Sequence, residues 1–138
     1  MTYFTRLPTQ EGSRRCFTLS IWMKRSRINK NFSSSTSLAI QGIFSGTSAG
    51  TTFMRFNDDA NGDEMRWYTP DGSTYHRPAR RDPCNWTHYM WVVDTGIEDD
   101  NNAADRFKLY VNGVEVQDVR SQGYASRNTQ LNMFSNST

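Results

Sequence analysis

Few side chains in this sequence could perform acid–base or nucleophilic chemistry. His76 and His88 are its only histidines, and His88 follows Trp86 by two residues on an expected strand, so that both share one face. As a functional group, His88 would be a general base or a metal ligand. No serine or cysteine nucleophile motif accompanies it, so we interpret it as a packed residue whose ring bonds a neighbouring strand or loop.

Two acidic stretches could bind calcium, which prefers oxygen ligands. Residues 57–63 imitate the start of an EF-hand loop, but Tyr68 occupies the twelfth position, where that loop needs an acidic residue. Residues 94–105 carry five carboxylates. We favour a hairpin turn in the first stretch and a solvated acidic loop in the second, and therefore expect no cofactor. The calcium candidates are Asp59, Asn61, Asp63, Asp99 and Asp100.

Basic and aromatic side chains are the candidates for binding. A cluster of arginines before Trp86 could hold phosphate, an acidic glycan or an acidic partner surface, or could form a solvated rim. An exposed tryptophan or tyrosine could stack on a sugar ring or serve a protein interface, although burial in the core is the favoured assignment for any single ring. The binding candidates are Trp67, Tyr75, Arg77, Arg80, Arg81 and Trp91.

Length and composition restrict the class of protein. The chain has 138 residues, enough for one domain with a hydrophobic core and too few for two, so residues 1–138 are expected to form a single domain. The formal net charge of +2 gives no drive toward nucleic acid or membrane, and no segment reaches the ~18 apolar residues of a membrane span. The first eight residues lack the apolar core of a signal peptide.

The sequence contains two cysteines, Cys16 and Cys84, whose side chains could form a disulfide. One pair of cysteines in a chain without a secretory signal more often remains reduced, because disulfides persist mainly in oxidising compartments. We therefore expect two free thiols.

Alternating apolar and polar residues predict strands along the whole chain. The clearest strand is Phe-Lys-Leu-Tyr-Val at residues 107–111, and the Asn112-Gly113 pair that follows tolerates the positive φ of a type I′ hairpin turn. Turn residues recur between the strands, and no window shows a helical period. The expected strands are residues 16–24, 37–45, 51–57, 64–69, 73–77, 86–93, 107–111 and 114–116. The chain is therefore predicted to be an all-β sandwich or barrel.

Three segments resemble a laminin-G-like domain, the two-sheet antiparallel β-sandwich of the concanavalin A-like jelly roll. They are residues 17–26, 81–88 and 107–114. The Trp-x-His and Tyr-Val-Asn-Gly motifs within them point to the fold far more specifically than to any ligand. Residues 3–8 and 12–15 are similar to a subgroup found in structural and adhesion proteins of bacteriophages, especially marine ones. The resemblance covers roughly residues 3–135.

The sequence departs from this family at two points. Cys84 stands where a small polar residue is usual, so no family role transfers to it. Family members usually continue past the position of Thr138 with strands that close the sheet. The sandwich is therefore expected to lack its C-terminal closing strands, or to receive one from a neighbour through an open edge, and an assembly role would suit such an edge.

The resemblance implies a structural or binding role without catalysis. Glucanases of this fold act through carboxylates at Glu-x-Asp-x-x-Glu spacing, which none of the four glutamates of this chain forms, so we expect no enzyme. The expected function is a bacteriophage structural or decoration protein, located in the virion. It would contact other virion proteins as a homo- or hetero-oligomer and bind neither nucleic acid nor membrane. The alternative is a carbohydrate-binding adhesion module that recognises host glycans.

Overall fold

Antiparallel strands make up most of the structure, a computed structural model that describes residues 9–10, 12–25, 40–46, 52–59, 62–69, 71–77, 84–98, 100–121 and 123–132. In chain order the strands are β1 (Cys16–Met23), β2 (Ile40–Gly46), β3 (Thr52–Asp59), β4 (Gly62–Thr69), β5 (Gly72–His76), β6 (Thr87–Asp94), β7 (Phe107–Val111), β8 (Val114–Glu115) and β9 (Val119–Ser121). One 3-10 helix, η2 (Asp100–Arg106), lies between β6 and β7. None of the helical residues described here is part of a helix long and apolar enough to cross a membrane.

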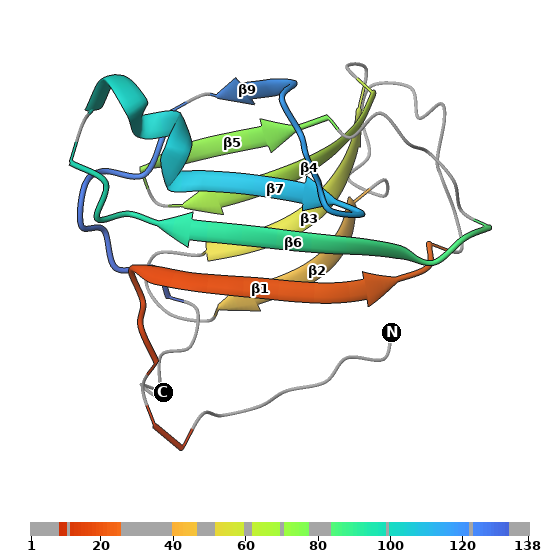
Figure 1. The fold of residues 1–138 in the computed structure, drawn as a ribbon, viewed down its shortest axis with the longest axis horizontal. Coiled ribbons are helices and arrows are strands. Elements are labelled where there is room, and N and C mark those ends of the chain that lie inside the picture. Colours follow the sequence, from red (N-terminus) through yellow and green to blue (C-terminus); the bar gives the residue numbers. More distant parts are fainter. Residues whose placement is uncertain are drawn as a thin grey trace.

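The strands form two antiparallel sheets. One has the strand order β1-β6-β7-β8 and the other the order β2-β3-β4-β5-β9. In Figure 1 the strands β1, β6 and β7 lie in front of the strands β2 to β5, so the two sheets form the layers of a sandwich. This confirms the predicted all-β, two-sheet fold. The expected lack of closing strands stays a prediction, because residues 133–138 lie outside the described part of the chain.

The hydrophobic core fills the space between the sheets, because each strand turns every second side chain inward. On β1 the side chains of Phe17, Leu19, Ile21 and Met23 are half-buried against the core, and the residues between them are exposed. The buried members of the core come from both sheets and from the segment after β9. They are Met54, Phe56, Met65, Trp67, Tyr89, Trp91, Val93, Phe107, Leu109, Ala125 and Leu131.

Trp67 joins the two sheets at the centre of the core. It belongs to β4, and its ring centroid lies 6.1 Å from that of Phe17 on β1 and 5.4 Å from that of Phe107 on β7. Only 2% of Trp67 is exposed. Aromatic pairs at such separations stabilise a fold by about 0.5–1.5 kcal/mol beyond the effect of burying their area. The Trp67 ring therefore contributes to both halves of the sandwich at once.

Two turns depend on glycine or on residues that tolerate positive φ. Asn112 and Gly113 have φ values of 50° and 81° between β7 and β8, which confirms the predicted hairpin turn. At the turn between β4 and β5, a Cβ atom on Gly72 would lie 2.5 Å from the carbonyl oxygen of Gly123. The absence of a side chain at Gly72 thus lets the segment after β9 pack directly on this turn.

That segment after β9 closes one end of the sandwich. Leu131 is fully buried, and its backbone N–H donates to the carbonyl of Arg14 at 2.9 Å, while Arg14 Nε donates back to the Leu131 carbonyl at 2.9 Å. Arg106 is 2% exposed and donates from Nη1 to the carbonyl of Ala125 at 3.0 Å. Backbone carbonyls thus supply part of the hydrogen bonding that a buried guanidinium requires.

The elements η2 and β9 were not predicted from the sequence. Strand β9 has only three residues, Val-Arg-Ser, which is too short to show an alternating pattern. The residues of η2, Asp-Asn-Asn-Ala-Ala-Asp-Arg, are mostly polar and lie in the stretch that was expected to be a solvated loop. Short 3-10 helices of this kind depend on their surroundings more than on helix propensity.

His76 links the two sheets through a buried hydrogen bond. Its side chain is 2% exposed on β5, and Nε2 lies 3.2 Å from the backbone carbonyl of Phe107 on β7. A carbonyl can only accept, so Nε2 carries the hydrogen. Burial lowers the pKa of His76 from 6.5 to about 4, and the hydrogen bond to Phe107 opposes this shift only in part.

We expect the stability of the protein to fall as the pH decreases from about 6.5 to about 4, because the unfolded chain takes up a proton on His76 that the folded chain resists. The stability from this residue is complete above pH 6.5. The two pKa values correspond to a loss of about 3 kcal/mol by pH 4. Urea unfolding across this range should show the loss in the unsubstituted protein and a much smaller slope in His76→Gln. Parallel pH profiles would contradict the assignment.

Candidate functional site: an arginine-rich sheet face

One face of the five-stranded sheet points away from the core and carries a row of arginines. The strand register makes Arg55, Arg66, Tyr75 and Arg120 direct neighbours on β3, β4, β5 and β9. Neighbouring strands lie about 4.8 Å apart, so these side chains form a line across the sheet. We call the following group of residues the arginine face: Arg55, Glu64, Arg66, Tyr75, Arg77 and Arg120.

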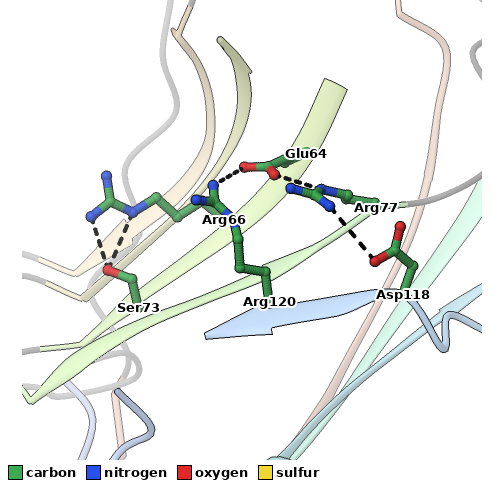
Figure 2. A network of polar contacts seen from close by, with 6 residues as sticks. All are labelled: Glu64, Arg66, Ser73, Arg77, Asp118 and Arg120. Atoms are coloured by element: carbon green, nitrogen blue, oxygen red, sulfur yellow. Dashed lines mark hydrogen bonds and ion pairs between the residues drawn. The ribbon is translucent and has the colours of Figure 1, made fainter. Parts of the chain in front are cut away.

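Glu64 is the centre of an ion-pair network on this face, shown in Figure 2. Its side chain is completely buried. Oε1 accepts a hydrogen bond from Arg77 Nε and Oε2 accepts one from Arg120 Nη2, each at 2.8 Å. The two arginine side chains are 34% and 32% exposed. Arg77 Nη1 also lies 3.9 Å from Oδ1 of Asp118. Two charge-assisted hydrogen bonds thus offset the cost of burying the carboxylate.

Two guanidinium groups lie over the ring of Tyr75. The Cζ atoms of Arg120 and Arg66 are 4.3 and 5.1 Å from the centroid of its ring. Arg66 is held in place by Ser73, whose Oγ accepts from Nη2 at 2.8 Å and from Nε at 3.3 Å. Tyr75 is only 5% exposed although it lies on the outward face, as expected for a ring beneath two planar cations.

The arginine face has an excess of positive charge. The pKa of Arg55 is lowered, first by partial burial and second by the charge of Arg66, while nearby Tyr75 acts in the opposite direction. Among the described residues, the face combines four guanidinium groups with the carboxylate of Glu64, and Asp118 lies at its rim. Such a surface attracts anionic groups.

This arrangement suits binding better than hydrolysis. Retaining glycosidases need two carboxyl groups about 5–5.5 Å apart. Glu64 instead has a guanidinium group on each of its oxygens, so the nearest charged partners are cations. That the chain is no enzyme stays a prediction.

A second surface exposes tryptophan on the outer face of the four-stranded sheet. Trp22 is 62% exposed, and its ring stacks on that of His88 with centroids 5.0 Å apart and planes at 29°. His88 Nε2 lies 2.7 Å from Ser20 Oγ, and the backbone N–H of His88 donates to Asn112 Oδ1 at 2.9 Å. Trp86, two residues before His88, is 63% exposed. We call Trp22, Trp86 and His88 the tryptophan patch.

The contact between His88 and Ser20 confirms that the histidine ring bonds a neighbouring strand. The sequence did not identify Ser20 as its partner, because the two residues are 68 positions apart and only the pairing of β1 with β6 brings them together. A serine beside a histidine nitrogen can act as a nucleophile and its base, but acyl transfer also needs donors placed for the developing negative charge. The stacking of Trp22 favours the structural interpretation.

The three aromatic binding candidates are buried, and for Trp67 and Trp91 this confirms the favoured assignment to the core. Trp67, Trp91 and Tyr75 are 2%, 3% and 5% exposed, so none offers a free face for stacking on a ligand. The first two point into the core and the third lies beneath Arg66 and Arg120. Among the basic candidates, Arg77 joins the Glu64 network. The other two, Arg80 and Arg81, lie outside the described residues.

The calcium candidates fall in two places. Asp59 and Asp63 belong to the hairpin of β3 and β4, which confirms the favoured hairpin interpretation of that stretch. Asp100 begins η2, whereas Asn61 and Asp99 lie outside the described residues. Within the described ranges, no group of three or more His, Cys, Asp or Glu side chains could hold a metal ion. Calcium binding stays a prediction.

The two cysteines are free, as predicted, and both are exposed. Cys16 pairs in register with Asp94, and Thr87 with Met23, so Cys16 and Thr87 lie about 23 Å apart along the sheet. Cys84 precedes Thr87 by three residues, which span about 11 Å at most. The separation therefore exceeds the ~7 Å between Cα atoms that a disulfide can bridge.

Replacing Glu64 by glutamine should destabilise the protein by about 2 kcal/mol, because two guanidinium groups would face each other without their shared counter-charge. This is less than for a fully buried pair, since both arginines can turn toward water. Urea unfolding of Glu64→Gln measures the effect. Glu98→Gln is the matched control, because Glu98 is 80% exposed and pairs with Arg127 at the surface. It should cost under about 1 kcal/mol, and equal losses would contradict the role of Glu64.

Comparison with known proteins agrees with the resemblance found in the sequence. A family model described as the concanavalin A-like lectin/glucanases superfamily matches residues 4–137. Neither the curated proteins nor the solved structures gave a match. The two-sheet fold and the family match fit a carbohydrate-binding or a structural module.

Proposed function

Because the chain belongs to the concanavalin A-like lectin/glucanases superfamily, we propose that it is a non-catalytic structural or decoration protein of a bacteriophage particle, which acts through contacts with other proteins of that particle. The superfamily alone does not decide this, since one fold carries many unrelated functions. The observation that supports a protein-binding role most directly is the tryptophan patch.

The tryptophan patch has the properties of the centre of a protein interface. Trp22 and Trp86 are each more than three-fifths exposed, and tryptophan is enriched among the residues that dominate binding energy. Stacking on His88 holds the Trp22 ring in one orientation, and Ser20 holds His88 in turn. A partner that covers a ring already fixed in place loses little side-chain entropy on binding.

The assignment to a bacteriophage rests on the sequence near the N-terminus. Residues 3–8 and 12–15 are similar to a subgroup of structural and adhesion proteins of bacteriophages. A protein of this kind is assembled with its partners in the host cytoplasm and remains in the virion. The contacts that it makes there are the property to test.

The double variant Trp22→Ser/Trp86→Ser should bind the other particle proteins, or itself, at least about 30-fold more weakly, because a buried tryptophan at an interface contributes about 2 kcal/mol or more. Sedimentation velocity and titration against purified capsid and tail proteins measure this. Phe44→Ser is the control, since Phe44 is 38% exposed on β2 of the other sheet. If the unsubstituted chain stays monomeric and has no affinity for particle proteins, the proposal fails.

A carbohydrate-binding adhesion module is the second candidate, and the setting of Trp22 favours it specifically. The outward face of an indole can stack on the C–H face of a sugar, and the Ser20 hydroxyl and the Asn112 amide next to the ring can bond sugar hydroxyls. Binding on a glycan array that is lost in Trp22→Ala and kept in Phe44→Ser would support this function over the first. Binding that survives in Trp22→Ala would remove this surface from consideration.

A further inference from the structure

We propose that the arginine face binds a sulfate or phosphate group between Arg66 and Arg120, above the ring of Tyr75. This site lies on the opposite sheet from the tryptophan patch, so the inference does not depend on the proposed function. Four observations carry it: the placement of the two guanidinium groups, a donor left over on Arg120, a neighbouring carboxylate held in the same way, and the charge of the row.

The two guanidinium groups are prepared for a shared ligand. Arg66 on β4 and Arg120 on β9 flank Tyr75 on β5 in register, so their side chains reach the ring from the two neighbouring strands. Their Cζ atoms lie 5.1 and 4.3 Å from the same ring centroid. A tetrahedral oxyanion above the ring can direct oxygens to both groups at once, and Ser73 already fixes the orientation of Arg66.

Arg120 retains a donor at this position. Its Nη2 bonds Glu64, whereas its Nε is buried and forms no hydrogen bond within the described residues. A buried N–H without an acceptor costs about 1–3 kcal/mol, and buried donors in native proteins usually have a partner. A shift of the Arg120 side chain, which is 32% exposed, would bring Nε to an oxygen of a bound oxyanion that supplies this acceptor.

The protein already holds one oxyanion in this way. The carboxylate of Glu64 lies between Arg77 and Arg120, with one oxygen 2.8 Å from each guanidinium group. Glu64 therefore shows that two arginine side chains on this face can bind one anionic group together. The proposed ligand uses Arg66 and Arg120, which belong to the neighbouring row across the sheet, two residues along β4 from Glu64.

The charge of the row favours an added anion. Partial burial and the neighbouring charge of Arg66 lower the pKa of Arg55, so the guanidinium groups repel each other in a poorly solvated setting. A bound dianion would reduce the repulsion between the guanidinium groups and would stabilise their positive charges where water is partly excluded. The Arg120 side chain is 32% exposed, which leaves it accessible to a solute.

The sulfate or phosphate group has two sources with the same chemistry. It can be a free inorganic ion, or it can be carried by an acidic polymer laid along the row, which extends about 14 Å from β3 to β9. The two sources differ in affinity, because several groups on one chain bind as linked ligands.

Calorimetric titration of the full chain with sodium sulfate, at fixed ionic strength in chloride, tests the site. We expect saturable binding that is at least about tenfold weaker in Arg66→Gln, which loses one charge-assisted contact. Arg127→Gln is the matched control, since Arg127 is an exposed arginine that pairs with Glu98 outside the arginine face. It should bind sulfate like the unsubstituted chain. No saturable binding, or the same affinity in all three proteins, overturns the proposal.

A measurement on the unsubstituted protein tests the site even if the Arg66 variant does not fold. The Nε–Hε resonance of Arg120 should shift saturably with sulfate and not with chloride, and a resonance that does not move contradicts the site. Dextran sulfate then identifies the source. Arg66-dependent binding of this polymer that is much tighter per sulfate group than the binding of free sulfate assigns the group to a polymer, and comparable affinity per sulfate group assigns it to the free ion.

Discussion

Trp67 contacts Phe17 and Phe107 across the space between the sheets, and this contact determines which side chains of β4 point away from the core. With Met65 and Trp67 turned into the core, the strand period of two must turn Glu64 and Arg66 outward. The same alternation sets which side chains point outward on the paired strands β3, β5 and β9. The arginine face is thus a geometric consequence of the packing behind it, and a change in the inward residues would move the arginines too.

Glu64 gives this outer face a structural function as well as a charge. It lies on β4, one of its partners follows β5 and the other belongs to β9, a strand of three residues at the edge of the sheet. Three backbone pairs hold β9 to β5, so the ion pair with Arg120 is a substantial part of its attachment. The ion pair therefore joins β9 to β4, two strands that are not neighbours in the sheet.

Local features of the sequence predicted local structure well. The alternation of Phe17, Leu19 and Ile21 and the Asn112-Gly113 pair are short-range signals, and the strand and turn that they predict are present. Strand β9 has no such signal. The fold class followed from many strand and turn signals of this kind, which together leave few alternatives.

The site could not be predicted in the same way, because it depends on register between distant strands. Glu64 and Arg120 are 56 positions apart, and nothing in either segment indicates the other. The sequence drew attention to Trp67 and Trp91 as aromatic candidates, but residue type does not reveal which face of a strand lies inward. Arg77 was a binding candidate because of its charge. In the structure it pairs with the buried carboxylate of Glu64, a residue that had been considered only as a catalytic group.

The positions of the two thiols limit how this molecule can be cross-linked. Cys16 and Cys84 lie toward opposite ends of β1 and β6 and cannot reach each other. Oxidation can therefore join them only to thiols of other molecules. A molecule with two such separate attachment points is a bifunctional monomer, so its oxidised products are chains or rings of several molecules whose formation depends on concentration.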